Sequence, residues 1–301
     1  MTGSTKLSLG PVLFYWSRDA LFDFYAQAAE MPVDIIYLGE TVCSKRRSLR
    51  SSDWLDIATE LSDNTDKEII LSTLALLEAE SELKTLRRLC ENGRFMVEAN
   101  DIGAVQILTQ RQLPFVTGPS VNIYNPATLK LLAAKGLKRW MLPIELSKET
   151  LRQMQSQRPQ GLETEVFCYG RMPLTLSARC FTARSHNLPK DDCQYKCIDY
   201  PDGRLLATQE GEPFLALNGI QTVSAKTCNL LPEIPLLREL KVDVLRISPQ
   251  STFTRQIVDA FHQSLNGSAI KDLGKYMPLG PCDGYWHGSS GLSACTESSP
   301  P

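Results

Sequence analysis

The sequence DIIYLG at residues 34–39 is a short apolar run that ends in glycine, and runs of this kind decide the fold expected for the chain. Four to eight apolar residues between polar or turn residues are typical of a strand that is buried on both faces. The pattern returns as EIILSTL at residues 68–74 and as FMVEA at residues 95–99. A helical pattern follows each run. Such alternation predicts a parallel sheet with helices outside it.

The alternation continues in both directions from these runs. Residues 7–15 predict a strand, and Ser17 begins the helix that follows it. Further strands are expected at or within residues 115–124, 139–146, 162–169, 213–224 and 242–247. About eight strands in one chain fit a (β/α) barrel better than an open doubly wound sheet. We therefore predict an α/β fold of TIM-barrel type, complete or irregular, with an inserted cysteine-rich loop. This single domain would span residues 1–287, and the Ser/Gly/Pro-rich residues 288–301 predict a disordered tail.

Charge and hydropathy exclude several classes of protein. A net charge of −2 gives no reason to expect nucleic-acid binding. No run approaches the roughly 18 apolar residues of a transmembrane helix. Arg18, Asp19 and Asp23 interrupt the apolar N-terminal stretch, so we expect no export and a cytoplasmic location. In that reducing compartment, nine cysteines point to metal or redox chemistry more than to disulfides.

Two polar, loop-like stretches carry the cysteines of greatest interest. Cys180, Cys193 and Cys197 share one stretch, and Cys43 lies in a second stretch at residues 40–47. Loops that follow barrel strands meet at one end of a barrel, so we expect these four thiols to converge. Four thiolates are the usual ligands of an iron–sulfur cluster and also form structural zinc sites. A single CxxxC spacing favours the cluster, and it leaves zinc and the absence of any metal open.

Basic residues surround the four cysteines. They would offset the negative charge of a cluster and raise its reduction potential. These residues are Lys45, Arg46, Arg47, Arg179, Arg184, Lys190 and Lys196.

Other reactive residues are given structural interpretations. We expect Cys90, Cys168 and Cys228 to pack in the core, and Cys282 to pack in a loop or to act as an alternate ligand. The histidines are expected in solvated or capping positions, which disfavours a hydrolase with a nucleophile–histidine pair. They are His186, His262 and His287.

Four further residues could serve a small ligand. Glu40 and Glu98 lie at strand ends, where they suit either acid–base chemistry or ion pairs with the basic loops. Asn122 and Tyr124 could contact a small ligand.

Several motifs along the chain resemble the UbiV family of ubiquinone-biosynthesis proteins, within the collagenase-like peptidases. The resemblance covers residues 7 to about 286 and is carried by residues 8–16, 37–47, 177–184, 217–222, 244–250 and 283–286. It implies a (β/α)-barrel-like domain without a working protease. It also implies a 4Fe-4S cluster held by the matching residues Cys43, Cys180, Cys193 and Cys197.

The resemblance implies partners and a pathway as well. UbiV proteins pair with UbiU, a related cluster protein, and work with the lipid-carrier protein UbiT. The expected role is therefore oxygen-independent hydroxylation of a ubiquinone precursor ring by a heterodimer. Relatives hydroxylate RNA with prephenate as the oxygen source, so prephenate is the implied donor. The alternative is a non-catalytic metal-binding subunit that completes a UbiU-like enzyme. A peptidase is the least favoured reading, because the chain lacks a convincing nucleophile–base pair.

Overall fold

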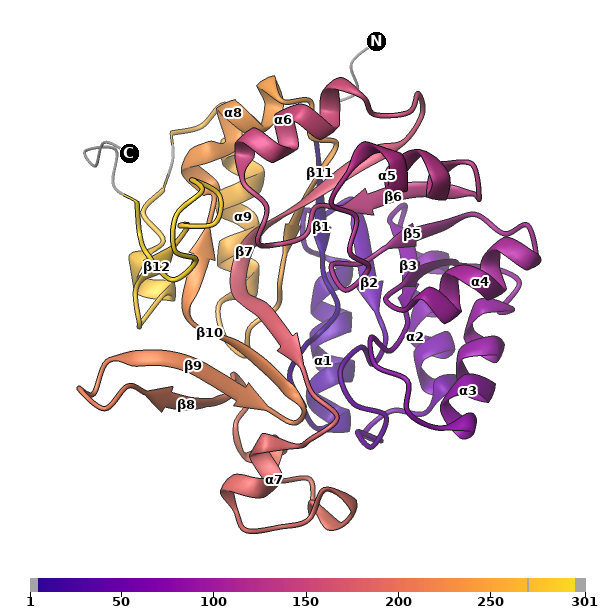
Figure 1. The fold of residues 1–301 in the computed structure, drawn as a ribbon, viewed down its shortest axis with the longest axis vertical. Helices are drawn as coiled ribbons and strands as arrows, with labels where there is room; N and C mark the ends of the chain where they lie inside the picture. Colours follow the sequence, from indigo (N-terminus) through magenta and orange to yellow (C-terminus); the bar gives the residue numbers. More distant parts are fainter. Residues whose placement is uncertain (1–4, 270, 296–301) are drawn as a thin grey trace.

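A closed barrel of eight parallel strands forms the centre of the molecule (Figure 1). The computed structural model describes residues 5–269 and 271–295. The strands follow the order β11-β1-β2-β3-β4-β5-β6-β7, and β7 pairs with β11 to close the ring. They are β1(Lys6–Leu9), β2(Ile35–Leu38), β3(Glu68–Ser72), β4(Met96–Ala99), β5(Phe115–Thr117), β6(Leu137–Met141), β7(Glu163–Leu176) and β11(Val244–Ile247). The predicted TIM-barrel-type fold is thus confirmed.

Helices cover the outside of the barrel and connect its strands. They are α1(Arg18–Ala29), α2(Ser51–Asn64), α3(Glu80–Cys90), α4(Ile102–Gln110), α5(Pro126–Ala133), α6(Lys148–Ser156), α8(Ile234–Glu239) and α9(Thr254–Leu265). Several begin at a side chain that accepts a hydrogen bond from the first turn, as helix starts favour. Ser17 caps α1, Asp101 caps α4 and Asn125 caps α5 in this way.

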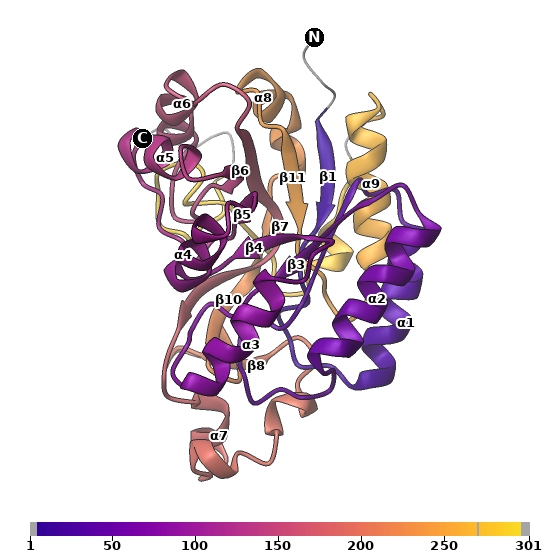
Figure 2. The ribbon, with the colours of Figure 1, turned by 90° about the vertical axis from the view of Figure 1, so that its right-hand side faces the viewer.

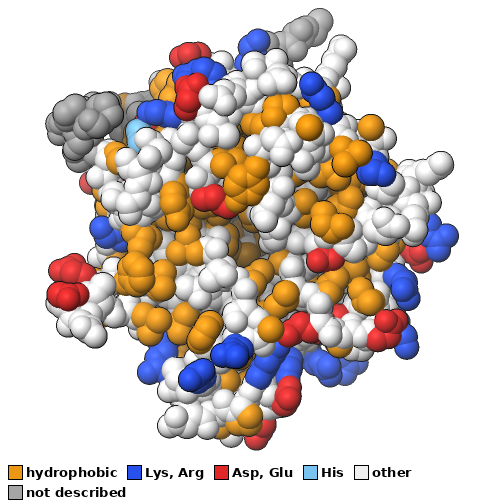
Figure 3. All heavy atoms as spheres, in the orientation of Figure 1, with side chains coloured by type: hydrophobic (Ala, Val, Ile, Leu, Met, Phe, Trp, Pro, Cys, Tyr) orange, Lys and Arg blue, Asp and Glu red, His pale blue; other side chains and the backbone are white. Residues whose placement is uncertain are grey.

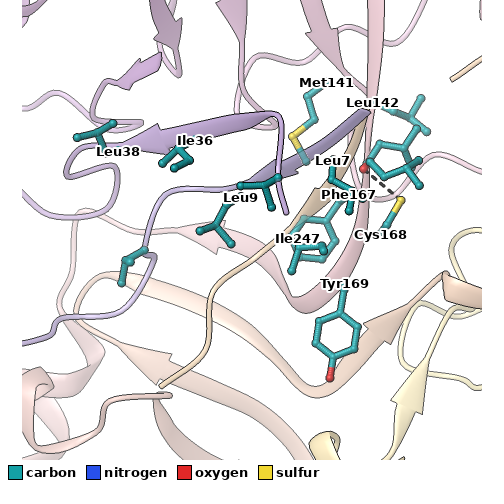
Figure 4. Close-up of a cluster of buried hydrophobic side chains, with 14 of the residues drawn as sticks. Leu7, Leu9, Ile36, Leu38, Met141, Leu142, Phe167, Cys168, Tyr169 and Ile247 are labelled. Atoms are coloured by element: carbon teal, nitrogen blue, oxygen red, sulfur yellow. Dashed lines mark hydrogen bonds between the residues drawn. The ribbon is translucent and has the colours of Figure 1, made fainter. Parts of the chain in front are cut away.

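The outer and inner faces of the barrel strands are both buried, and they differ in the side chains that they carry. Side chains such as Leu7, Leu9 and Ile36 pack in the large apolar core, part of which Figure 4 shows. Successive side chains of a strand point to opposite faces, so Ser8 and Tyr37 lie on the inner face of the barrel. That inner face holds a small apolar cluster and a network of buried charged groups.

An insertion between β7 and β11 extends the barrel wall at its carboxyl end. The strand expected at residues 162–169 continues to Leu176, so β7 leaves the barrel near Gly170. A Cβ atom at residue 170 would lie 2.6 Å from the Cβ of Ser248, and its φ is +130°, so the site requires glycine. The outer half of β7 pairs with β10(Gln221–Asn229), which continues through β9(Pro213–Asn218) to β8(Arg204–Ala207).

The cysteine-rich part of the insertion lies at the far end of this sheet. It contains α7(Phe181–Ser185) and the short turns η1(Lys190–Asp192) and η2(Lys196–Asp199). Figures 1 and 2 both place α7 beyond the barrel, at the outer end of β7.

A short segment after α9 pairs with the insertion. After η4(Gly274–Tyr276), β12(Pro281–Cys282) pairs with β10. Residues 288–295 belong to the expected tail, and Ser293 and Cys295 form hydrogen bonds with Asp283. Residues 296–301 of that tail lie outside the described residues. Across the described part of the chain, no helix has both the length and the apolar character to cross a membrane.

Candidate functional site

A cavity of about 350 Å³ opens at the carboxyl end of the barrel strands. TIM-barrel enzymes carry their active sites at this end. Its lining includes Thr41 and Val42, directly before Cys43, and the outer part of β7 from Pro173 to Leu176. The segments that lead into the two cysteine loops therefore form walls of the cavity.

Arg246 and Glu98 lie at the floor of the cavity. Arg246 Nη1 donates a hydrogen bond of 2.6 Å to Glu98, and its Nε and Nη2 each donate one of 2.9 Å to Glu165. The guanidinium also stands 3.9 Å from the centre of the Tyr37 ring. Burial acts to lower the pKa of Arg246, but the two carboxylates outweigh it and hold this pKa well above the usual value. Burial favours protonation of Glu165, but Arg246 outweighs it and lowers its pKa. The charged groups at the floor of the cavity therefore form ion pairs with one another.

Glu40 and Glu98 both lie in ion pairs, which agrees with the salt-bridge interpretation of these residues. Glu98 pairs with Arg246, and Glu40 lies 3.5 Å from Arg46. Burial raises the pKa of Glu40, and Arg46 opposes that shift. The Glu40 carboxylate also accepts hydrogen bonds from the backbone N–H groups of Val42 and Cys43. It therefore shapes the start of the first cysteine loop.

The two cysteine loops lie beside each other. Burial raises the pKa of the Cys43 thiol, and the nearby Cys180 thiol adds to this shift. Burial also raises the pKa of Cys197 to about 11, with contributions from Cys43 and Cys180. Thiols perturb one another in this way only over short distances. Cys193 and Cys43 both act on Lys45, whose pKa is raised mainly by its hydrogen bond to Asp191.

The two cysteine loops do not form a single-ion metal site among the described residues. Within residues 5–269 and 271–295, no group of three or more His, Cys, Asp or Glu side chains is arranged to hold one metal ion. The structure thus brings the predicted ligands to one end of the molecule without forming a compact single-ion site.

Arg46 is a buried cation between the cysteine loops. Its Nη1 donates to the carbonyl oxygen of Leu13 at 2.9 Å, and its Nη2 donates to the backbone oxygen and Oδ1 of Asn218 at 2.7 and 2.6 Å. Gly219 lies close to the guanidinium. A Cβ atom at this position would be only 3.0 Å from Nη2. The Arg46 guanidinium acts to lower the pKa of the Cys197 thiol, against the larger effect of burial. The Nε of Arg46 is buried and has no hydrogen-bond partner among the described residues.

Asn218 joins three segments around this cation. Its Nδ2 donates to the carbonyl oxygens of Cys197 and Tyr200 at 2.9 and 2.8 Å. Its Oδ1 accepts from the N–H of Tyr15 at 2.9 Å as well as from Arg46. A single buried amide thus ties the second cysteine loop to the first and to the segment after β1.

Further contacts hold the cysteine-rich segment in place. The backbone N–H of Gly219 donates to Thr182 Oγ1 at 3.0 Å, which fixes α7. Lys45 Nζ donates to the carbonyl oxygen of Lys190 at 3.1 Å, which connects the two loops directly. Figure 3 shows Lys and Arg side chains gathered over this end of the molecule. The expected basic surroundings of the cysteines are therefore present.

The remaining cysteines lie elsewhere. Cys90 is buried on α3, and Cys168 is buried on β7, where its thiol donates to the carbonyl oxygen of Val166 (Figure 4). Cys228 and Cys282 face each other across β10 and β12, near Gly170. An extended strand from Gly170 to Leu176 spans about 20 Å, so Cys282 is too far from the four thiols to act as an alternate ligand.

The histidines and the two expected ligand contacts have clear local roles. His186 contacts Tyr200, His262 contacts Asn266 and His287 contacts Lys148, which fits polar or capping positions. Asn122 lines the cavity. Tyr124 instead donates to Glu145, and burial and that carboxylate raise its pKa to about 12.

Sequence reasoning missed Asn218 and Arg246 as site residues. Each stands in a motif that carries the family resemblance, at residues 217–222 and 244–250, and that was the available signal.

A family model and a curated relative match the sequence. A model of peptidase family U32 matches residues 22–269. The tRNA hydroxylation protein P of Escherichia coli (strain K12) is 28% identical over 119 residues, which are 39% of this chain and 26% of that protein. The chain therefore spans about a quarter of the length of this relative.

Two solved structures are similar at the level of the backbone. The U32 peptidase Mk0906 has a TM-score of 0.46 and 12% identity, covering 83% of this chain and 95% of that one. The orotidine 5′-phosphate decarboxylase of Pyrococcus horikoshii OT3 has a TM-score of 0.43 and 10% identity, covering 86% of this chain and 100% of that one. Because its family model matches most of the sequence, the chain belongs to peptidase family U32.

Proposed function

We propose that this chain is an iron–sulfur protein that takes part in a hydroxylation reaction, with a 4Fe-4S cluster held by Cys43, Cys180, Cys193 and Cys197. One observation carries the proposal: the two cysteine loops meet around Arg46, a buried cation whose Nε has no partner among the described residues. A buried donor without an acceptor is unfavourable. A cluster with four thiolates is anionic, so its sulfur atoms would supply the missing acceptor and balance the charge.

The sequence spacing of the cysteines favours a cluster over zinc. Structural zinc sites usually contain two short cysteine or histidine knuckles, whereas this chain has one CxxxC and two isolated cysteines. Four cysteine thiolates are also the usual ligands of an iron–sulfur cluster.

The hydroxylation role is supported by family membership and by the similarity to a tRNA hydroxylation protein. We extend it to oxygen-independent hydroxylation of a ubiquinone precursor, because the resemblance to the UbiV family lies on both cysteine loops. A UbiU-like chain would then be the heterodimer partner, a UbiT-like protein the lipid carrier and prephenate the oxygen donor. The cavity beside the loops is the site where we place the substrate ring.

A second candidate is a non-catalytic subunit that completes the site of a UbiU-like enzyme. The floor of the cavity favours it, because Glu98 and Glu165 are both engaged by Arg246. No carboxylate at the floor is therefore free to act as an acid or a base without breaking a buried ion pair.

Metal analysis after anaerobic purification tests the cluster. We expect about four iron and four sulfide per chain, and Cys193→Ala should lose them while the barrel remains folded. Cys295→Ala is the matched control, because Cys295 is also partly exposed and lies away from the two cysteine loops. Stoichiometric zinc in place of iron, or full iron in Cys193→Ala, would show that the assignment is wrong.

An activity measurement separates the two candidates. Turnover of a ubiquinone precursor by this chain alone, with prephenate supplied, would establish a catalytic subunit. Turnover that requires a UbiU-like partner and survives loss of the substrate cavity in this chain would establish the non-catalytic role.

A further inference from the structure

A second cavity, of about 200 Å³, lies beside the barrel-mouth cavity, and we call it the Arg171 cavity. Gly170 and Arg171 line it from β7, and residues 248–250 line it from the segment after β11. Ser248 lines both cavities, so they are neighbours. In chain order, β7 and β11 are the seventh and eighth strands of the barrel. TIM barrels frequently bind a phosphate group with the loops after these two strands.

Arg171 is a partly buried cation in the lining of this cavity. Its Nη1 donates a hydrogen bond of 2.8 Å to the backbone carbonyl of Asp202, and it forms no ion pair with a carboxylate of the described residues. Burial lowers the pKa of Arg171, and the nearby Asp202 carboxylate opposes this shift without cancelling it. That carboxylate is itself engaged by the N–H and hydroxyl groups of Ser251. By contrast, Arg139 and Arg246 inside the barrel pair directly with carboxylates. The charge of Arg171 is therefore only partly compensated.

Two further polar side chains line the Arg171 cavity. Lys275 is exposed, its Nζ lies 4.8 Å from the centre of the Tyr276 ring, and it has no ion-pair partner in the described part of the chain. Ser248 is only 5% exposed, and its hydroxyl forms no hydrogen bond with another described residue. The side chain of Ser248 lies close to Gly170, which lines this cavity and not the barrel-mouth cavity. A buried hydroxyl without a partner is unfavourable unless a ligand or water satisfies it.

Apolar side chains form much of the remaining lining. They are Phe14, Pro249, Phe253, Tyr276 and Pro278. The rings of Phe253 and Tyr276 have their centres 5.2 Å apart, and Phe253 is 50% exposed. The φ of Phe253 is +65°, in the left-handed region that is strained for a bulky residue. Strained residues of this kind cluster at ligand sites, and an exposed aromatic ring offers a surface to an apolar group.

From these features we infer that the Arg171 cavity binds a phosphate monoester of a small apolar group. The phosphate lies between Arg171 and Lys275 and accepts a hydrogen bond from the Ser248 hydroxyl. The apolar group packs against Phe253 and Tyr276. Small-molecule sites usually exceed about 300 Å³, so a cavity of about 200 Å³ takes a ligand smaller than a nucleotide. This site goes beyond the proposed function, because none of the four cysteines lines it.

Titration calorimetry with phenyl phosphate, phenol and inorganic phosphate tests the site in the full-length, anaerobically purified protein. Phenyl phosphate carries both halves of the expected ligand, and each of the other probes carries one half. Hydrogen bonds to charged groups should make phenyl phosphate bind at least about tenfold more tightly than phenol. Burial of the ring should make it bind at least about tenfold more tightly than inorganic phosphate. An affinity no higher than that of phenol would overturn the phosphate site, and one no higher than that of inorganic phosphate would overturn the ester.

Three variants locate the phosphate. Lys275→Met removes an exposed cation from the lining, so phenyl phosphate should bind about three- to fivefold more weakly and phenol should be unaffected. Lys84→Met makes the same change at an exposed position of α3 away from the cavity, and all affinities should stay at the wild-type level. Equal weakening in these two variants would show a general effect of net charge and overturn the site. Arg171→Met should weaken phenyl phosphate binding by about tenfold or more, and Lys275→Met keeps the test valid if this variant does not fold.

The iron-free variant separates this inference from the cluster assignment. Cys193→Ala should bind phenyl phosphate with wild-type affinity, because no cysteine lines the Arg171 cavity. Loss of binding in this variant would overturn the placement of the ligand. Normal iron content in a wild-type protein that does not bind phenyl phosphate would refute only the phosphate site. Binding of phenyl phosphate by a wild-type protein without iron would refute only the cluster.

Discussion

Replacement of Asn218 by leucine tests whether this one amide holds the cysteine-rich segment on the barrel. Leucine has nearly the same shape and removes four hydrogen bonds, to Cys197, Tyr200, Tyr15 and Arg46. A neutral hydrogen bond contributes about 1 kcal/mol and one to a charged group about 1.5 to 3 kcal/mol. Their sum is roughly 5 kcal/mol, but bonds to one side chain are not additive. We therefore expect the free energy of unfolding to fall by about 3 kcal/mol.

Urea unfolding followed by circular dichroism measures this loss, and limited proteolysis shows where it acts. The variant should be cleaved first within residues 177–203, while the barrel is cleaved at the wild-type rate. Asn64→Leu is the matched control, because Asn64 forms a single exposed hydrogen bond to the Glu60 carbonyl at the end of α2. A change no larger than that of Asn64→Leu, or an unchanged cleavage pattern, would refute the reasoning.

Two other substitutions test the barrel itself. Arg246→Met leaves the carboxylates of Glu98 and Glu165 buried without their cation, so urea unfolding should show a loss of about 3 to 5 kcal/mol; a loss below 1 kcal/mol would contradict the charged-floor description. Asp53→Ala removes an acceptor for the Arg50 N–H and the bidentate partner of Arg18, which should cost about 1 kcal/mol at neutral pH. The hydrogen bond from Arg18 lowers the pKa of Asp53 to about 2, so this contribution is complete above about pH 4 and is lost as the pH falls toward 2. Thermal melts of wild type and Asp53→Ala should therefore converge at low pH, and a constant difference down to pH 2 would contradict this account.

The barrel could be predicted from the sequence, because its strands are buried on both faces. The runs IIYL at residues 35–38 and IIL at residues 69–71 are continuously apolar and stand out from their surroundings. The insertion lacks this signal. In β8, the residues from Leu205 to Ala207 are exposed, and β10 mixes Thr, Ser and Lys with apolar residues. β10 is specified by its pairing with the outer half of β7, and β8 by its pairing with β9, contacts that only the folded chain brings into place.

The candidate site also has a part that could be predicted from the sequence and a part that could not. Its four cysteines could be proposed because their residue type and spacing are unusual within a polar loop. The contact of Arg46 with Asn218 joins residues 172 positions apart, and nothing local in either segment predicts it. The compensation of Arg246 by two carboxylates likewise depends on three separate strands meeting inside a closed ring.

The pairing of β7 with β10 has a consequence for how this protein can vary. The chain leaves the barrel at Gly170 and returns at Cys228, and these two residues are partners on the same rung of the antiparallel ladder. Partners of that kind have Cα atoms about 5 Å apart. The whole insertion therefore leaves and rejoins the barrel at two neighbouring positions. Because the entropy of closing a loop grows slowly with its length, the module that carries three of the cysteines can be lengthened, shortened or exchanged without reopening the ring.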